Sequence, residues 1–290
     1  MNASFRSALL AGEQLGQRYA LSVPQAALTG LSGAQLARHP GSSLDFQDYR
    51  EYEPGDDLRR IDWNVFARTD KLTVKLFREE VNPHLDLLID GSRSMNLEDS
   101  RKAEALLKLA AVFATAAENS RCTHTAWLAA GGFQKIPNGT ERPSLWDGIH
   151  FDGARPLAEE FAVAPPKLRR AGIRVLLGDL FWPGNPSPTL RRLAEGAAAV
   201  FVVQVFAQAD AEPPEQGNLR MVDSESGEMV EIFVDAMVAQ RYRDDLARHQ
   251  QAWHLACRQM GARMTTLIAE PLLTADSLRS LEETEILTPA

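Results

Sequence analysis

The stretch LDLLIDGSRSM, residues 85–95, decides how we expect this chain to fold. Residues 85–89 form a short, mostly apolar run of the kind found in strands that are buried on both faces. Asp90 ends this run, and Gly91 permits a sharp turn directly after it. The stretch therefore predicts a buried strand that delivers an aspartate to a tight loop.

Apolar strands and amphipathic helices alternate along the rest of the chain. We expect further strands at 125–130, 173–177, 200–206 and 263–268, and a β-hairpin at 221–234. We expect helices at 98–118, 157–161, 188–197, 236–260 and 275–283, the last with Thr274 as its N-cap. This alternation predicts an α/β domain with a mostly parallel sheet flanked by helices.

Residues 1–80 have a different character, because they are rich in turn formers and charges. We expect short strands at 44–46 and 73–77, and one helix within 23–37. The chain is therefore divided after residue 80. Residues 1–80 form an N-terminal helix with a β-rich segment, and residues 81–290 form the α/β domain.

Composition places the chain among soluble globular proteins. Of its 290 residues, 44% are hydrophobic and 24% are charged, which excludes disorder, collagen and coiled-coil rods. A net charge of −8 argues against non-specific binding to nucleic acid, which needs a basic face. Cys122 and Cys257 are the only cysteines, too few for a disulfide framework or a Cys-rich zinc site. The longest apolar run, 197–207, is well short of the roughly 20 residues of a membrane span, so we expect a cytoplasmic protein.

Asp90, Ser92 and Ser94 place one carboxylate and two hydroxyls on a single tight loop. Such hard oxygen ligands suit Mg²⁺ or Mn²⁺. The alternative is that Asp90 caps the following helix while the serines make ordinary turn hydrogen bonds. Asp179 follows the strand at 173–177, and ligands bind at the carboxyl ends of such strands. It is a candidate second carboxylate, or else an aspartate that accepts hydrogen bonds from nearby backbone amides.

The densest run of charge is REYEPGDDLRRIDWNVFAR, Arg50–Arg68. Pro54-Gly55 within it predicts a type II turn. The favoured interpretation is an ion-pair network that attaches the N-terminal region to the α/β body, and the alternative is a ligand-binding role. The candidate residues are Arg50, Glu51, Tyr52, Gly55, Asp56, Arg59, Asp62, Trp63 and Arg68.

Several catalytic signatures do not occur in this sequence. The motifs G-x-x-x-x-G-K-[ST], G-x-G-x-x-G, G-x-S-x-G and H-E-x-x-H are all missing. This argues against nucleotide hydrolysis, dinucleotide binding, serine hydrolysis and zinc peptidase activity. We therefore expect a non-enzymatic binding module. Two rivals stay open: a metal-dependent phosphoesterase that uses Asp90 and Asp179, and a scaffold whose metal site has been lost and whose interface is the charged Arg50–Arg68 region.

The motifs together resemble the bacterial domain-of-unknown-function 58 family (DUF58), whose members carry a von Willebrand factor A-like domain. The matching segments are Arg50–Arg68, then KLTVKLFREE at Lys71–Glu80, then Leu85–Met95. The resemblance is detailed over residues 44–95 and continues in strand–helix order to about residue 270. It implies a von Willebrand factor A-like, Rossmann-like sheet.

The resemblance also implies a metal-ion-dependent adhesion site, where bound Mg²⁺ accepts a carboxylate from a partner protein. Asp90, Ser92 and Ser94 match the first metal motif, and Asp179 matches a later aspartate. Gly178 stands before it, where a serine is common. The middle Gly-Thr-Asp motif is replaced by residues 153–157, GARPL, which supplies no threonine hydroxyl and introduces Arg155. This metal site is therefore incomplete.

Relatives in that family are often encoded beside MoxR-type AAA+ ATPases. The resemblance thus implies a protein-protein interaction or assembly module that acts with such an ATPase. It implies no nucleic-acid partner.

Overall fold

The structure, a computed structural model, describes residues 2–24, 27, 44–79, 83–98, 100–182, 184–213, 215–224 and 227–290. The chain forms two compact units, which we call the α/β unit (residues 1–27 and 83–290) and the hairpin unit (residues 28–82). Residues 1–27 thus belong to the α/β unit, which differs from the boundary expected after residue 80. The helix expected within 23–37 falls, apart from residues 23, 24 and 27, outside the described residues.

A six-stranded sheet forms the centre of the α/β unit. In spatial order its strands are β11 (Arg263–Ile268), β8 (Ala199–Phe206), β7 (Ile173–Gly178), β4 (His84–Asp90), β5 (Thr123–Ala129) and β6 (Phe133–Lys135). All neighbours pair in parallel except β6, which runs antiparallel to β5. The mixed α/β class and the mostly parallel sheet are confirmed. The pattern missed β6, which has only three residues.

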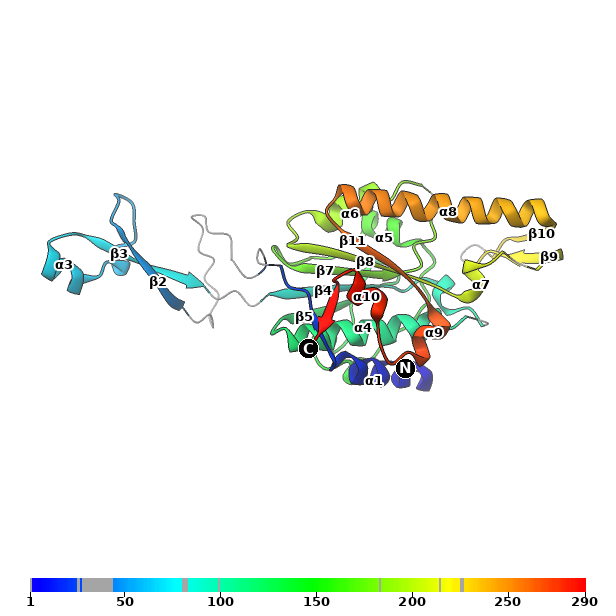
Figure 1. Cartoon of the computed structure of the whole chain (residues 1–290), viewed down its shortest axis with the longest axis horizontal. Helices are drawn as coiled ribbons and strands as arrows, with labels where there is room; N and C mark the ends of the chain where they lie inside the picture. Colours follow the sequence, from blue (N-terminus) through cyan, green and yellow to red (C-terminus); the bar gives the residue numbers. More distant parts are fainter. Residues whose placement is uncertain are drawn as a thin grey trace. The chain divides into compact units, whose positions relative to one another are not determined.

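Helices cover both faces of this sheet (Figure 1). On one face lie α1 (Ala3–Gly16), α4 (Lys102–Asn119), α9 (Ala269–Thr274) and α10 (Arg279–Glu283), and on the other α5 (Leu157–Val163), α6 (Ser187–Ala194) and α8 (Ala236–Gln259). Strand β4 serves both layers, because Leu87 and Ile89 pack with the α4 layer and Leu88 with the α8 layer. Burial on both faces is the reason that this strand is so apolar.

Three predictions about helices are corrected. The helix expected from residue 98 begins at Lys102, because residues 93–96 form a short 3-10 turn. Of the helix expected at 275–283, only Arg279–Glu283 (α10) is helical, and the preceding helix, α9, ends at Thr274. Its hydroxyl donates to the carbonyl oxygen of Pro271, so Thr274 is not an N-cap. Helix α1, which packs against α4, was not predicted.

The smaller elements of the α/β unit pair locally. β1 (Tyr19–Leu21) runs antiparallel to β12 (Leu287–Pro289), and α7 (Gln208–Ala211) follows β8. β9 (Gly217–Val222) and β10 (Met229–Val234) form the expected hairpin. Within the described residues, no helix combines the length and the apolar character that a membrane span requires.

The hairpin unit contains β2 (Leu44–Glu51) and β3 (Thr73–Glu79), which include the strands expected at 44–46 and 73–77 and which pair antiparallel. Between them lie the 3-10 turn Leu58–Arg60 and helix α3 (Trp63–Thr69). The helix begins at Trp63 because the Asp62 carboxylate accepts hydrogen bonds from the backbone N–H groups of Asn64 and Val65.

Candidate functional site

The order of the sheet reverses between β4 and β7. From β4 the chain continues to β5 and β6 on one side, and it later adds β7, β8 and β11 on the other. In open sheets of this kind, ligands bind beyond the carboxyl ends of the strands at such a point. Asp90 ends β4 and Asp179 directly follows β7, and both are buried. The fold therefore brings these two predicted residues to one place.

Asp90 is buried and closely packed. Its Oδ1 accepts a hydrogen bond of 3.0 Å from the backbone N–H of Ser92. Burial raises the pKa of Asp90 to about 7, and the negative charge of Asp179 adds to this effect. A Cβ at Gly178 would lie 2.9 Å from both Cβ and Oδ2 of Asp90. The glycine at this position thus leaves the space that the Asp90 side chain fills.

Ser92 and Ser94 follow with a spacing that suits a cation. Their hydroxyl groups share a hydrogen bond of 2.9 Å, as in the alternative in which the serines bond within the turn. Adjacent ligands of an octahedral Mg²⁺, at about 2.0–2.1 Å from the ion, are separated by about 2.9 Å. In the part of the chain that is described, no three His, Cys, Asp or Glu side chains gather as a metal site. A cation here would depend on one carboxylate, two hydroxyls and water.

Gly153, the first residue of the segment GARPL, lies beside this loop. Gly153 pairs with Ser92 in an isolated parallel bridge, and the backbone N–H of Arg93 donates to the Gly153 carbonyl oxygen. Arg155 forms two hydrogen bonds of 3.2 Å to the carboxylate of Glu160, which is fully buried. The positive charge of Arg155 is therefore neutralised by its own ion pair.

Lys102, which the sequence analysis did not single out, brings a positive charge into the site. Its Nζ lies 2.9 Å from Oδ2 of Asp179 and 3.0 Å from Oδ2 of Asp210, and its side chain is 3% exposed. Burial alone would lower the pKa of Lys102, but the charges of the two aspartates raise it above its usual value. We call Asp90, Asp179, Asp210 and Lys102 the charged cluster.

A signal for Asp210 was present in the sequence. It follows the buried strand β8 closely, just as Asp90 and Asp179 follow β4 and β7. Since these three strands are neighbours in the sheet, the same rule that selects the first two aspartates selects the third. Lys102 carried no comparable signal, because a lone lysine in a helix is usually exposed.

Hydrogen bonds fix Asp179 from several sides. Its Oδ1 accepts from the backbone N–H of Phe181 at 3.1 Å, which is the local role that the sequence left open for it. The amide nitrogen of the buried Gln204 donates to the Asp179 carbonyl oxygen at 3.0 Å. The Thr266 hydroxyl donates in turn to Gln204. Asp179 is therefore a rigid part of the site.

An apolar cavity of about 390 Å³ adjoins the charged cluster. It is lined by Phe181, Trp182, Tyr242, Asp245, Leu246 and His249. The hydroxyl of Tyr242 donates to the carbonyl oxygen of Asp210 at 2.7 Å, and the Lys102 ammonium lies 6.0 Å from the centre of the Phe181 ring. The aromatic lining of this cavity thus reaches the charged cluster through Tyr242 and Phe181.

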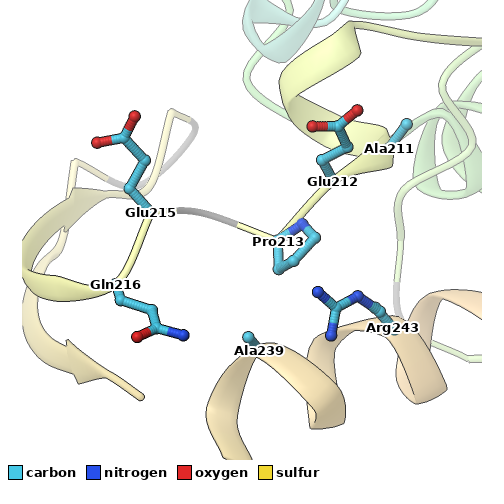
Figure 2. A pocket seen from close by; sticks show the side chains of 7 residues that line it. All are labelled: Ala211, Glu212, Pro213, Glu215, Gln216, Ala239 and Arg243. Carbon is cyan, nitrogen blue, oxygen red and sulfur yellow. The ribbon is translucent and has the colours of Figure 1, made fainter. Parts of the chain in front are cut away.

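A second cavity, of about 440 Å³, lies where α7, the start of β9 and α8 meet (Figure 2). In Figure 2 the Arg243 side chain extends from α8 toward the segment that carries Pro213. No residue of the charged cluster lines either cavity, but Tyr242 and Phe181 of the first cavity lie against Asp210 and Lys102. We therefore place the candidate site at the carboxyl ends of β4 and β7.

Residues of the charged motif Arg50–Arg68 bond to one another within the hairpin unit. Asp56 accepts from Arg50 at 2.7 Å and from the backbone N–H of Glu53 at 2.9 Å. Gly55 has a φ of +113°, which the predicted turn requires of a glycine. Asp57 accepts from the backbone and the side chain of Arg59.

Four further motif residues stabilise the same unit. The backbone N–H of Tyr52 donates to Leu72, and the Glu51 carboxylate lies 3.9 Å from the ammonium of Lys71. Arg68 donates to a carbonyl oxygen of its own helix, and Trp63, a residue that is 59% exposed, packs edge-on against the ring of Phe66. These contacts join the motif residues to their own unit, and the expected attachment of the N-terminal region to the α/β body stays a prediction.

Asp62 is the best-connected residue of this motif. Its Oδ2 lies 3.0 Å from the ammonium of Lys75 and accepts a hydrogen bond from the hydroxyl of Tyr49. The hydrogen bond from Lys75 is the main cause that lowers the pKa of Asp62 to about 2.

Comparison with known proteins identifies relatives of this chain. Residues 48–252 match the model of a family described as "Protein of unknown function DUF58". The uncharacterised proteins Rv1480 of Mycobacterium tuberculosis and Mb1516 of Mycobacterium bovis are each 29% identical over 265 residues, covering 86% of this chain and 82% of theirs.

Three solved structures show weaker likeness. BatB of Bacteroides thetaiotaomicron is 16% identical (TM-score 0.29), and an aerotolerance-related membrane protein of Bacteroides fragilis is 15% identical (TM-score 0.30). Each match covers 62% of this chain and 99% of the other. The PilB minor pilin of Streptococcus sanguinis is 11% identical (TM-score 0.33), with 87% and 80% covered. These scores are too low to establish a shared fold.

Proposed function

Because the chain belongs to the DUF58 family, whose function is unknown, we propose a function from its site: a non-enzymatic module that binds a partner protein through residues 90–94. The observation that carries the proposal is the pair of buried carboxylates, Asp90 and Asp179, where the strand order reverses. The adjoining apolar cavity supports a protein ligand, since protein interfaces combine apolar pockets with a few polar groups. The strand order, with one antiparallel edge strand, supports a von Willebrand factor A-like arrangement.

A catalytic role has less support. In the described part of the chain, the hydrogen bond that joins a hydroxyl to a histidine ring is the one between Thr123 and His84, at 2.7 Å. These residues are the first of β5 and β4, so they lie at the amino ends of the strands, whereas Asp90 lies at the carboxyl end of β4. His249 lines the adjoining cavity, but its Nε2 is bound to the carbonyl oxygen of Leu180. Among the described residues, the site therefore lacks the hydroxyl–histidine pair that activates a nucleophile.

Asp90, Ser92 and Ser94 fit Mg²⁺ by the chemistry and the spacing of their oxygens. When bound, Mg²⁺ would supply an open coordination position for a carboxylate of the partner. The chain contributes the fixed ligands, while Gly178 keeps the space for Asp90. Asp179 would act through water, because Lys102 and the Phe181 N–H already occupy its two oxygens.

The partner that we propose is a MoxR-type AAA+ ATPase, as the family resemblance implies. The test measures binding between the full chain and the MoxR-type ATPase of the same organism by biolayer interferometry, in MgCl₂ and in EDTA. Asp90→Asn is expected to weaken binding by about 2 kcal/mol or more, because it changes a buried charged group at the interface. Asp86→Asn is the matched control, since Asp86 is a buried aspartate near the other end of the same strand.

Equal binding of wild type and Asp90→Asn would disprove the proposed function. Partner binding that depends on Asp90 but is unchanged in EDTA would support a binding module that works without a metal. Hydrolysis of p-nitrophenyl phosphate that requires MgCl₂ and Asp90 would instead establish the phosphoesterase.

A further inference from the structure

Lys102 places a fixed positive charge on Asp179, the second carboxylate of the candidate site. The residue begins α4, only a few positions after the loop that carries Asp90, Ser92 and Ser94. Its ammonium touches Asp179 and Asp210, and its side chain is 3% exposed. Water therefore screens this charge very little.

The pairing leaves the charged cluster unevenly neutralised. Lys102 balances one of the two negative charges that it contacts. Asp90 has no Lys, Arg or His within ion-pair distance among the described residues, and its recorded partner is the backbone N–H of Ser92. A cation bound by Asp90 would thus approach a carboxylate, Asp179, that already contacts the Lys102 ammonium.

We propose that Lys102 is the resident counter-ion of this site and limits its affinity for divalent cations. The proposal rests on the metal part of the proposed function. Two cations that share the Asp179 carboxylate repel each other, so the metal binds only by displacing the ammonium or by tolerating its charge. In the opposite case, where Lys102 only holds Asp179 in place, its loss would weaken metal binding.

The expected effect is large enough to measure. Charges of +1 and +2 that lie about 6 Å apart repel each other, even with the dielectric constant of water, by an energy that corresponds to about tenfold in affinity. In the poorly hydrated cluster the repulsion is stronger. Replacing Lys102 with an apolar residue of similar length should therefore tighten binding by about tenfold or more.

The test titrates MnCl₂ into the full chain and measures free Mn²⁺ by electron paramagnetic resonance. Lys102→Met is expected to bind Mn²⁺ about tenfold more tightly than wild type. Lys108→Met is the matched control, because Lys108 is also buried in α4 but donates to the carbonyl oxygens of Leu272, Leu273 and Ala275. It should bind like wild type. Adding Asp90→Asn to Lys102→Met should abolish the gain.

Unchanged, weaker or undetectable Mn²⁺ binding in Lys102→Met overturns the inference. Loss of partner binding with a persistent gain in Mn²⁺ affinity would contradict the proposed function alone. If Lys102→Met does not fold, ¹⁵N NMR of the lysine ammonium groups in the wild-type chain decides. MgCl₂ should then shift the Lys102 signal and not that of Lys108, and a Lys102 signal that never shifts overturns the inference.

Discussion

The ion pair between Lys102 and Asp179 gives the sharpest prediction about stability. Both side chains are almost fully buried, at 3% and 5% exposure, and their charged atoms are 2.9 Å apart. Lys102→Met removes the ammonium and leaves a buried carboxylate without its cation. Losing one partner of such a pair costs about 3–5 kcal/mol, mainly because the remaining charge stays desolvated.

A double-mutant cycle separates this pairing energy from other consequences of the substitution. Lys102→Met leaves the carboxylate charge of Asp179 unpaired, and Asp179→Asn removes that charge. The double variant should therefore be more stable than the sum of the two single changes in free energy of unfolding predicts. We expect a coupling energy of about 2 kcal/mol or more, within the range observed for groups in contact. The combination of Asp179→Asn with Lys108→Met should instead be additive, because Lys108 bonds to carbonyl groups around α9.

The assay is urea unfolding followed by tryptophan fluorescence in a Trp63→Phe background. Trp63 is the one tryptophan of the hairpin unit, so the four that remain of the five report on the α/β unit. The reasoning is refuted if Lys102→Met is as stable as the background protein. It is also refuted if the cycle with Asp179→Asn gives a coupling energy near zero.

Three further predictions concern other parts of the chain. Gly178→Ala should destabilise the α/β unit by about 1–3 kcal/mol in urea unfolding, because its Cβ would lie 2.9 Å from Asp90, and an unchanged midpoint would contradict this. The pKa of Asp62 is lowered, so its ionised carboxylate stabilises the hairpin unit. This stabilisation is complete above about pH 4 and disappears as the pH falls toward 2. Acid titration followed by ¹³C NMR of this carboxyl should give a midpoint near 2, and Lys75→Met should raise it. Burial lowers the pKa of His124, so stability should fall as the pH drops through and below about 6.5, where the unfolded chain takes up the proton first. His124→Gln should reduce the dependence of the free energy of unfolding on pH, measured between pH 5 and 8.

Local sequence determined the strands and most of the helices of this protein. Strands buried on both faces must be apolar over their whole length, so β4, β7 and β8 are visible as short apolar runs. Residues at the ends of those runs identified Asp90 and Asp179, because a parallel sheet places its ligands at the carboxyl ends of its strands. The capping role of Asp62 and the turn at Gly55 also follow from local chemistry.

Tertiary structure alone decided which charges meet. Lys102 lies 77 positions before Asp179, and no periodic pattern relates the two. Their contact depends on how α4 packs against one face of the sheet and on the order of the strands in that sheet. The role of Gly178 became visible in the same way, since a glycine chosen for a close approach looks in sequence like any other glycine. Local sequence thus determines which strand ends carry an aspartate. Long-range packing determines which cation pairs with these aspartates, and therefore the net charge of the site.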